Sequence, residues 1–548
     1  LFNERARSLA EVSIPYNSSY QTVRILHART IKPDGTVIAV KPEDIRSTSP
    51  FSDYLMYDDA LAVSFSMPAI EDNCVIDYTY EMVTKPLLMR GKFWAYWGFS
   101  DPFPVSLSRY TLSVPATMLS KAKVYNDDAL KPYIQKLSPD GKFMIFAWQE
   151  QNLKPLVVEP AMPDLRQAKI WMEVSSIGSW QDIAKWFWGL QSPQAKPSDA
   201  IRGQVARLID GKTTDQEKAK AIYNWVANSV RYVGLEFGLS AFRPHSASEV
   251  FQKLYGDCKD KATLLITMLN IAGIKAWPVL LTAGEQRPVE NGLPTLDAFD
   301  HCIAQAQVAG KIVWLDATAE TCSYGDIPEA DRGAHALVVR DGTGEFQVIP
   351  AYSPDENGLD TTTRVTLHND GSATSHSQIS LIGGAGQLIR STVRAITPDR
   401  RKEMMQQIAG KISSGATLID FLAPDGKDKS GPYTMNLTIS APNYARITGS
   451  LLLLPVASGT ISDRPNEFVK DTRVWPIVET ESYFVKQVTT VSLPAGVQVV
   501  DVPADLNLTG PLHSYLRVIK RSADGKSLVI TESDTETAGT IPAASYSQ

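Results

Sequence analysis

Tyr255-Gly256-Asp257-Cys258-Lys259-Asp260-Lys261-Ala262 is the stretch that decides how the middle of this chain folds. Apolar residues follow at helical spacings, and a glycine then stands where a helix C-cap is expected: Leu264, Leu265, Met268, Leu269, Ala272 and Gly273. The pattern predicts a helix with one buried face and with Cys258 at its N-terminus. Unpaired N–H groups and the helix dipole favour a thiolate there, and Lys259 and Lys261 add positive charge. This stretch alone leaves a nucleophile and an inert structural cysteine equally open.

A predicted hairpin downstream carries a histidine and an aspartate. Its two strands would contain residues 299–304 and 311–318, with Gly310 between them. A turn at Val308 and Ala309 would pair His301 directly with Asp316, whereas a turn at Ala309 and Gly310 would make them diagonal neighbours. Either register leaves both side chains on one face of the sheet and turns Cys302 to the other face. Cys258, His301 and Asp316 would thus supply the nucleophile, base and orienting acid of thiol acyl transfer.

These residues resemble the bacterial transglutaminase-like superfamily, in the subgroup whose core is flanked by β-rich domains of unknown function. The resemblance rests on residues 256–262, His301 and residues 314–318, and extends over roughly residues 176–355. Supporting matches are Trp225, Arg231-Tyr232-Val233, Phe242-Arg243-Pro244 and Ser248-Glu249-Val250. The resemblance implies a papain-like core in which Cys258 is the nucleophile, His301 the base and Asp316 the orienting acid. The superfamily includes amide cross-linkers, cysteine proteases, glycan-releasing amidases and inactive members, so the resemblance implies a chemistry without a substrate.

The chain divides into three regions by its local patterns. Residues 1–175 read as short strands joined by Asp-Gly turns, which predicts an N-terminal β-sandwich-like domain. Residues 176–355 open with helix-capping signals and end in strands, which predicts the α+β catalytic core. Residues 356–548 return to β signals, with a short helical insertion at about residues 386–409. The predicted fold class is therefore α+β, a papain-like transglutaminase core between two β-rich domains.

The surroundings of the predicted nucleophile are less well defined. The backbone N–H of Cys258 is the expected first donor to an oxyanion. Gln252, Trp225 and Tyr232 are candidates for a second donor, although an exposed glutamine and two core aromatic residues are the simpler interpretations. Residues 283–297 are polar and rich in Pro and Gly, so we expect a loop that precedes His301 and borders the substrate cleft.

Composition and length exclude several classes of protein. The 548 residues carry a net charge of -6, which argues against a nucleic-acid partner. Four cysteines are too few for a disulfide scaffold; Cys302 and Cys322 could pair, but we expect free thiols. No metal-binding or cofactor-binding motif is visible, so we expect no metal and no cofactor. The longest apolar run near the C-terminal end, residues 451–457, is too short to span a bilayer. The chain begins at Leu1 without a secretory signal, and we expect a periplasmic or extracellular, cell-envelope location after loss of a leader.

The sequence therefore predicts a thiol-dependent acyl-transfer enzyme that acts on a peptide or protein substrate, including cell-envelope material. We favour hydrolysis, as in a protease or amidase, over cross-linking, because amine transfer needs a site that binds an amine and excludes water. The alternative is a non-catalytic cell-envelope module that binds protein or glycan on the same scaffold.

Overall fold

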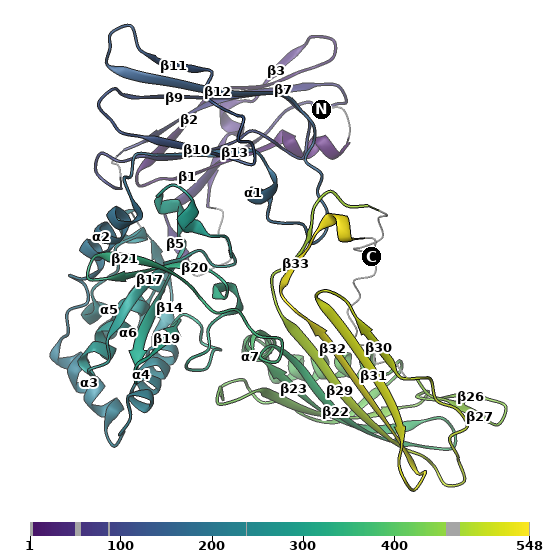
Figure 1. Ribbon diagram of the computed structural model, residues 1–548. Helices are drawn as coiled ribbons and strands as arrows, with labels where there is room; N and C mark the ends of the chain where they lie inside the picture. The colour runs from purple at the N-terminus through teal and green to yellow at the C-terminus, as the bar shows by residue number, and fades with distance from the viewer. Residues whose placement is uncertain (1–3, 50–55, 86–87, 237, 456–471, 547–548) are drawn as a thin grey trace.

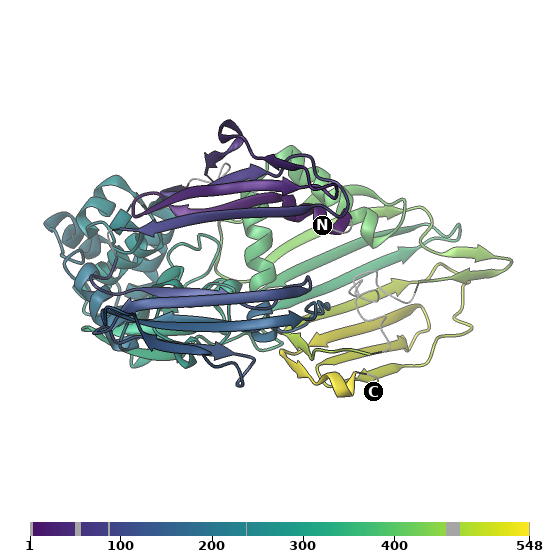
Figure 2. The same cartoon turned by 90° about the horizontal axis from the view of Figure 1, so that it is seen from above.

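The computed structural model describes residues 4–49, 56–85, 88–236, 238–455 and 472–546. Figure 1 shows a β-rich N-terminal region above a helical middle region, with a large C-terminal sheet beside the middle region. Seen from above in Figure 2, the helices of the middle region lie at one end and the C-terminal sheet at the other. None of the described helices is both long and apolar enough to cross a lipid bilayer.

The N-terminal region contains two sets of strands, and each set has its own apolar cluster. The first set has sheets ordered β1-β6-β4 and β3-β2-β7, and the second has sheets ordered β10-β13-β8 and β11-β12-β9. Val12, Ile14 and Phe65 lie in the first cluster, whereas Trp148 and Met172 lie in the second. The strands are β1 (Glu11–Asn17), β2 (Gln21–Ile31), β3 (Val37–Ala39), β4 (Arg46–Thr48), β6 (Ala60–Ser66), β7 (Val75–Thr84), β8 (Trp94–Gly98), β9 (Val105–Pro115), β10 (Lys121–Tyr125), β11 (Ile134–Leu137), β12 (Phe143–Leu153) and β13 (Trp171–Ser175).

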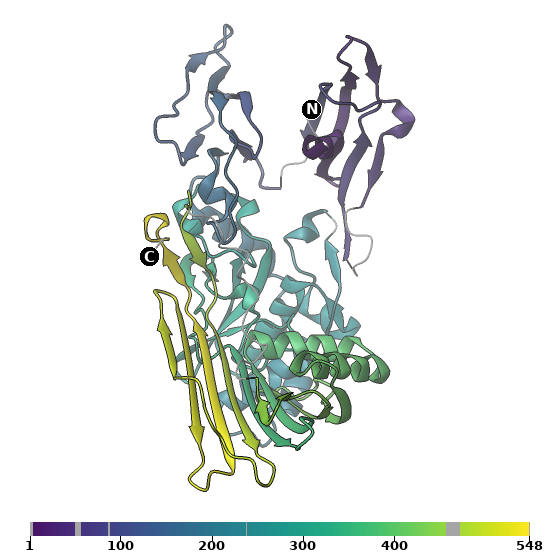
Figure 3. The ribbon, with the colours of Figure 1, turned by 90° about the vertical axis from the view of Figure 1, so that its right-hand side faces the viewer.

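Figure 3 shows these two sets standing apart above the rest of the molecule. The sequence suggested one sandwich, but the structure has two small ones, because each group of strands buries its apolar face within its own set. The short strand β5 (Met56–Asp58) leaves the first set and pairs in parallel with β15 (Gly234–Glu236) of the middle region. A short helix, α1 (Leu165–Ala168), precedes β13.

The middle region packs helices against a five-stranded antiparallel sheet of order β19-β18-β17-β20-β21. Ser179 and Thr214 form the predicted capping boxes, and Ser246 accepts a hydrogen bond from the N–H of Glu249. The helices are α2 (Trp180–Gln191), α3 (Asp199–Ile209), α4 (Asp215–Ser229), α5 (Ala247–Lys253) and α6 (Cys258–Ile271), and the strands are β17 (Ala276–Leu281), β18 (His301–Val308), β19 (Lys311–Leu315), β20 (His335–Arg340) and β21 (Thr343–Val348).

Helix α6 is the centre of this region. Leu264, Leu265 and Met268 pack in one apolar cluster with Ala304 and Ala306 of β18, whose small side chains let the helix approach the sheet. The sequence predicted one buried face, but every residue of α6 from Cys258 to Leu269 is buried. The prediction was incomplete because α3, α4 and α5 cover the side of α6 that faces away from the sheet.

The hairpin of β18 and β19 selects one of the two registers left open by the sequence. Ala304 pairs with Leu315 and Val308 pairs with Lys311, so Ala309 and Gly310 form the turn. Both turn residues have positive φ, 47° and 79°, as a two-residue type I′ turn requires. Asp316 follows directly after β19, which makes it the diagonal neighbour of His301 across the hairpin.

The C-terminal region is built on an eight-stranded sheet of order β24-β25-β23-β22-β29-β32-β31-β30. The helical insertion forms α7 (Gly384–Ala395) and α8 (Pro398–Ile412), which pack on β23, β24 and β25. The helices cover one face of the sheet in Figure 3. The strands are β22 (Gly358–Leu367), β23 (Ala373–Ile382), β24 (Thr417–Leu422), β25 (Tyr433–Ala441), β29 (Tyr483–Ser492), β30 (Leu506–Thr509), β31 (His513–Arg521) and β32 (Ser527–Glu536), with the smaller pairs β26 (Arg446–Thr448) with β27 (Leu451–Leu453) and β28 (Ile477–Glu479) with β33 (Gly539–Ile541).

The region boundaries expected from the sequence fall between elements. Residue 175 ends β13, and residue 355 lies between β21 and β22. The division into three domains stays a prediction, since the regions also share contacts described below.

Candidate active site

The N-terminus of α6 is held by a capping box. The Asp257 carboxylate accepts a hydrogen bond from the Asp260 N–H at 3.1 Å, and the Asp260 carboxylate accepts one from the Asp257 N–H at 3.3 Å. Gly256 is required here, because an added Cβ would lie 2.6 Å from the Cβ of Asp260. Cys258 is therefore the first residue of α6, as the sequence predicted, and it is only 7% exposed.

The two lysines that follow the cysteine stabilise neighbouring structure. Lys259 forms a buried ion pair with Asp257, next to the helix N-terminus. Lys261 is fully buried and donates to the carbonyl oxygens of Ala227 and Val230 at the C-terminal end of α4. Burial lowers the pKa of Lys261 to about 8. Lys261 thus joins α6 to α4 and satisfies carbonyl groups that a helix end leaves free.

His301 and Asp316 lie together, and Asp316 is firmly held. His301 Nε2 is 3.3 Å from Asp316 Oδ2, and Asp316 is 1% exposed. Asp316 Oδ1 accepts hydrogen bonds from the backbone N–H of Thr318 at 2.8 Å and from its hydroxyl at 2.7 Å. The Tyr223 hydroxyl donates to the backbone carbonyl of Asp316 at 3.1 Å. Burial opposes ionisation of Asp316, but His301 and Thr318 outweigh it and hold the pKa of this carboxyl below its usual range.

Cys258 also interacts with the imidazole of His301. Burial disfavours a charged His301, but the charge and hydrogen bond of Asp316, and then a hydrogen bond with Cys258, raise the pKa of His301 well above its usual range. Because Nε2 faces Asp316, Nδ1 is the ring nitrogen left for the thiol. The structure therefore brings the three predicted site residues together, in an order suited to proton transfer from sulfur to imidazole.

The other cysteines lie in different environments. All four are free thiols, so Cys302 and Cys322 do not form a disulfide. Cys302 belongs to the same apolar cluster as Cys258, and burial raises the pKa of its thiol well above the usual range. Burial likewise raises the pKa of Cys322. Of the four, Cys258 alone combines a helix N-terminus with a histidine partner.

Half-buried aromatic rings pack around the apolar cluster that contains Cys258. They include Trp180 and Trp186 of α2, Tyr232, Phe242 and Phe299. Trp186 meets Phe242 edge-on at 5.5 Å between ring centroids, and Trp180 meets Phe299 in the same way at 5.7 Å. The rings give the site an apolar wall contributed by a helix, a loop and the segment before β18.

Only one of the three candidates for a second oxyanion donor lies in this cluster. Gln252 is exposed on α5, and Trp225 packs on Phe251 in the separate cluster that contains Leu264 and Met268. Tyr232 joins the Cys258 cluster, because its strand β14 (Arg231–Tyr232) pairs with β16 (Tyr255–Gly256), directly before the cysteine.

The loop that precedes His301 is anchored to both flanking regions. It contains two short 3-10 helices, η4 (Val289–Asn291) and η5 (Leu296–Ala298). Buried Glu173 of β13 accepts a hydrogen bond from the Leu293 N–H at 2.5 Å, and the Ser175 hydroxyl donates to the Pro294 carbonyl at 2.6 Å. On the other side, the Gln286 amide donates to the Thr480 carbonyl at 3.1 Å. These bonds fix the route by which the chain enters β18.

Two residues near the site were missed by sequence reasoning. His245 donates from its backbone N–H and bonds through Nδ1 to Asp260, at 2.7 and 3.0 Å, and so supports the α6 cap. Asp331 ends the short helix η6 (Glu329–Asp331) and is 1% exposed. Neither has a sequence signal, since each lies in a connecting segment whose position depends on tertiary packing.

Asp331 lies close to His301 and Asp316. One nitrogen of His301 and one carboxylate oxygen each of Asp316 and Asp331 lie within 4.8 Å of one another. Three such donors could in principle surround a cation, but both oxygens of Asp316 already accept hydrogen bonds from Thr318, and one also faces His301. We therefore interpret His301 and Asp316 as a hydrogen-bonded pair, with the buried Asp331 carboxyl beside it.

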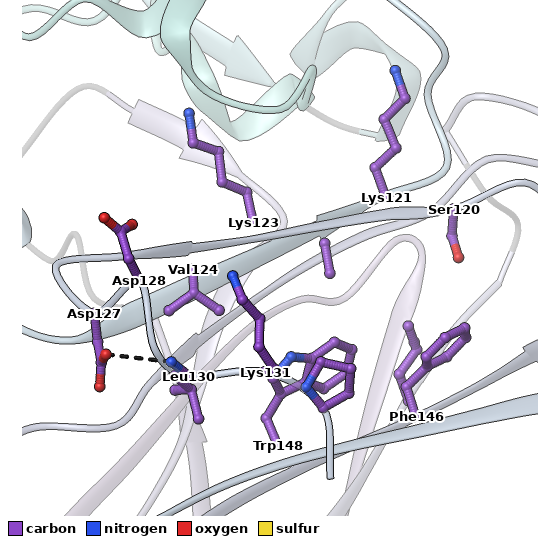
Figure 4. Close-up of a pocket in the computed structure, with 13 residues that line it drawn as sticks. Ser120, Lys121, Lys123, Val124, Asp127, Asp128, Leu130, Lys131, Phe146 and Trp148 are labelled. Atoms are coloured by element: carbon purple, nitrogen blue, oxygen red, sulfur yellow. Dashed lines mark hydrogen bonds between the residues drawn. The ribbon is translucent and has the colours of Figure 1, made fainter. Parts of the chain in front are cut away.

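The cavity drawn in Figure 4 lies elsewhere, in the second set of N-terminal strands. It has a volume of about 470 Å³, and Phe146 and Trp148 line it, with Lys131, Asp127 and Asp128 beside them. None of its lining residues belongs to the Cys258 group, so it is separate from the proposed chemistry.

The comparisons with known proteins concern the fold of the chain. Residues 202–318, which include Cys258, His301 and Asp316, match the Transglutaminase-like superfamily, and residues 1–157 match a domain of unknown function, DUF3857. A solved structure named "putative protease" from Parabacteroides distasonis ATCC 8503 is 17% identical, with 100% of this chain and 90% of that chain covered and a TM-score of 0.67.

A second solved structure, named "putative cysteine protease" from Cytophaga hutchinsonii, is 15% identical over 41% of this chain and 78% of that chain, with a TM-score of 0.19. No curated protein matches the chain. The Parabacteroides structure shows a shared fold, and the middle region of this chain is a transglutaminase-like core within a β-rich α+β fold.

Proposed function

We propose that this chain, whose residues 202–318 form a transglutaminase-like core, hydrolyses peptide or amide bonds through a covalent thioester at Cys258. One observation carries the proposal: Cys258 begins a buried helix and interacts with His301, whose Nε2 is 3.3 Å from the buried carboxylate of Asp316. This is the nucleophile, base and orienter arrangement that acyl transfer requires.

The reaction follows from these positions. His301 takes the proton of the Cys258 thiol at Nδ1, and the sulfur attacks the carbonyl carbon of the substrate. The resulting oxyanion lies near the N-terminus of α6, where the backbone N–H of Cys258 can donate to it. The tetrahedral intermediate collapses as His301 returns the proton to the leaving amine, which departs and leaves a thioester.

Water completes the cycle. His301 removes a proton from the water as its oxygen attacks the thioester carbonyl, and the same proton then returns to the sulfur as the acid product leaves. Asp316 keeps the proton of the imidazole on Nε2 throughout and stabilises the imidazolium. The balance is one water consumed for each amide bond broken.

The acidic side chains near the cysteine support hydrolysis over amine transfer. A site for an amine acceptor would need a free carboxylate near the thioester. Asp257 is paired with Lys259, and Asp260 is bonded to His245 and the helix cap. The Asp300 carboxylate accepts a hydrogen bond from the Ala283 N–H at 2.9 Å. These three carboxylates are therefore committed to internal bonds.

Limiting iodoacetamide followed by peptide mapping tests the nucleophile. We expect Cys258 to be labelled first at neutral pH, and we expect Cys258→Ser to lose both the label and all turnover. Cys302→Ser is the matched control, because Cys302 lies in the same apolar cluster without a histidine partner. Preferential labelling of Cys302, together with an absence of turnover, would favour the non-catalytic binding module.

The fate of the acyl group is tested by offering a peptide amide donor with and without a fluorescent primary amine. Hydrolysis predicts acid product in both reactions and little fluorescence in the donor peptide. Efficient incorporation of the amine would instead identify the chain as a cross-linking enzyme.

A further inference from the structure

Asp331 is a buried acid that the reaction described above leaves unused. It reaches the site from the long connection between β19 and β20, and it is as well buried as Asp316. Its Oδ2 has no hydrogen-bond partner among the described residues, although oxygens of buried carboxylates are normally satisfied. The atoms that it approaches are those of His301 and Asp316, within 4.8 Å.

The charges around Asp331 favour the protonated form of its carboxyl group. The charged groups near it are Asp316, His301, Asp300 and Arg332, and the Cys322 thiol also lies near enough to interact with it. Arg332 is already paired with Asp326 at 2.6 Å, so it does not fully neutralise Asp331. Two buried carboxylates this close cannot both ionise freely, and one of them keeps a proton.

Asp316 is the member that stays ionised. The N–H of Thr318, its hydroxyl shared between the two oxygens, and His301 all bond to the Asp316 carboxylate, whereas Asp331 Oδ2 has no hydrogen-bond partner among the described residues. Asp331 is thus the carboxyl that holds the proton. A neutral carboxyl can stay buried beside the charged Asp316 without a hydrogen-bond partner for Oδ2 at a lower cost than a second carboxylate.

We propose that Asp331 is a positioning residue for His301: a carboxyl that carries a proton next to Asp316 and, once ionised, adds a negative charge that stabilises the imidazolium. The inference rests on the proposed function of the Cys258 site. It assigns a role to a side chain that lies outside the nucleophile, base and orienter.

The direction of the effect on pH dependence follows. Burial, together with the charge of Asp316, raises the pKa of Asp331 to about 7. Below this pH Asp331 is neutral, and an asparagine in its place changes no charge. Above it Asp331 is negative and favours the protonated imidazole. Asp331→Asn should therefore lower the pH at which His301 loses its proton, by about one unit, and leave behaviour near pH 5 unchanged.

The experiment uses the full chain and needs no substrate. The Cε1–H resonance of His301 is assigned with a His301→Asn variant and followed by NMR from pH 5 to 10. The expected result is a lower deprotonation midpoint in Asp331→Asn than in the wild type. Glu320→Gln is the matched control: it removes a carboxylate from the same connection, where it pairs with Arg394 at 2.8 Å and not with Arg332, so it should not move the His301 midpoint.

Three results would overturn the inference. Equal midpoints in the wild type and Asp331→Asn would show that Asp331 does not act on His301. If that variant does not fold, the wild type decides alone. The chemical shift of His301 must then show an inflection near pH 7, where Asp331 ionises, and the absence of this inflection would overturn the inference. A stoichiometric divalent ion in the wild type that is lost in Asp331→Asn would replace the proton with a metal. The labelling of Cys258 by iodoacetamide tests the proposed function, whereas the His301 midpoint tests the role of Asp331. The two measurements are independent, so the failure of one is distinguished from the failure of the other.

Discussion

Replacing Asp316 with asparagine should abolish most of the turnover while preserving the fold, and the reason lies in the hydrogen bonds of its carboxylate. Oδ1 accepts from the backbone N–H of Thr318 at 2.8 Å. A backbone N–H can only donate, so the amide oxygen of an asparagine must take the position of Oδ1. The amide nitrogen then occupies the position of Oδ2, which is 3.3 Å from Nε2 of His301.

An amide N–H that points at Nε2 forces that nitrogen to accept. His301 would then carry its proton on Nδ1, which faces Cys258, and could not take the proton of the thiol. The variant also loses the negative charge that raises the pKa of His301. In a serine triad the same change lowers kcat about 10⁴-fold. We expect a fall of about 10³–10⁴-fold in kcat/KM, which corresponds to about 4–5.5 kcal/mol of transition-state stabilisation.

The assay is release of amine from a peptide amide that the wild type turns over, run beside the iodoacetamide labelling rate of Cys258. Asp326→Asn serves as the control, since it makes the same chemical change in the connection that follows Asp316 but lies outside the site. Circular dichroism and thermal unfolding should show that Asp316→Asn remains folded. Turnover above about a tenth of the wild-type value would refute the tautomer argument, because a wrong tautomer costs far more.

Three further changes test the structure around the site. Gly256→Ala places a methyl group against Asp260 and should lower the free energy of unfolding by about 1–3 kcal/mol in urea titrations, whereas Gly189→Ala, with open space around it, should not. Burial lowers the pKa of Lys261 to about 8, so the folded protein releases this proton at a lower pH than the unfolded chain does. The free energy of unfolding of the wild type, measured relative to Lys261→Met, should therefore rise by roughly 3 kcal/mol between pH 8 and about 10.4. A difference that stays constant over this range would contradict the argument. Glu173→Ala removes the acceptor of a backbone N–H in the loop before β18 and should speed limited proteolysis within residues 284–298; unchanged cleavage would show that the loop is held by other contacts.

The sequence predicted those features of the site that depend on neighbours along the chain. The start of α6 at Cys258 follows from Asp257 and Asp260, whose reciprocal bonds span three residues. The shared face of His301 and Asp316 follows from the two-residue period of a strand, which holds in either register. Both are short-range relations, so the order of residues contains them.

Tertiary structure decided what depends on distant segments. The hairpin register was settled by a two-residue turn with positive φ at Ala309 and Gly310, within a sheet whose other strands fix the position of β18. Lys261 reads in sequence as a charge near the cysteine, but the packing of α4 against α6 directs it to the end of α4. Asp331 has no pattern that links it to His301, because a connection of irregular structure carries it there. Such contacts join residues that lie far apart along the chain and follow no repeating pattern. Only the folded arrangement of the helices and strands determines them.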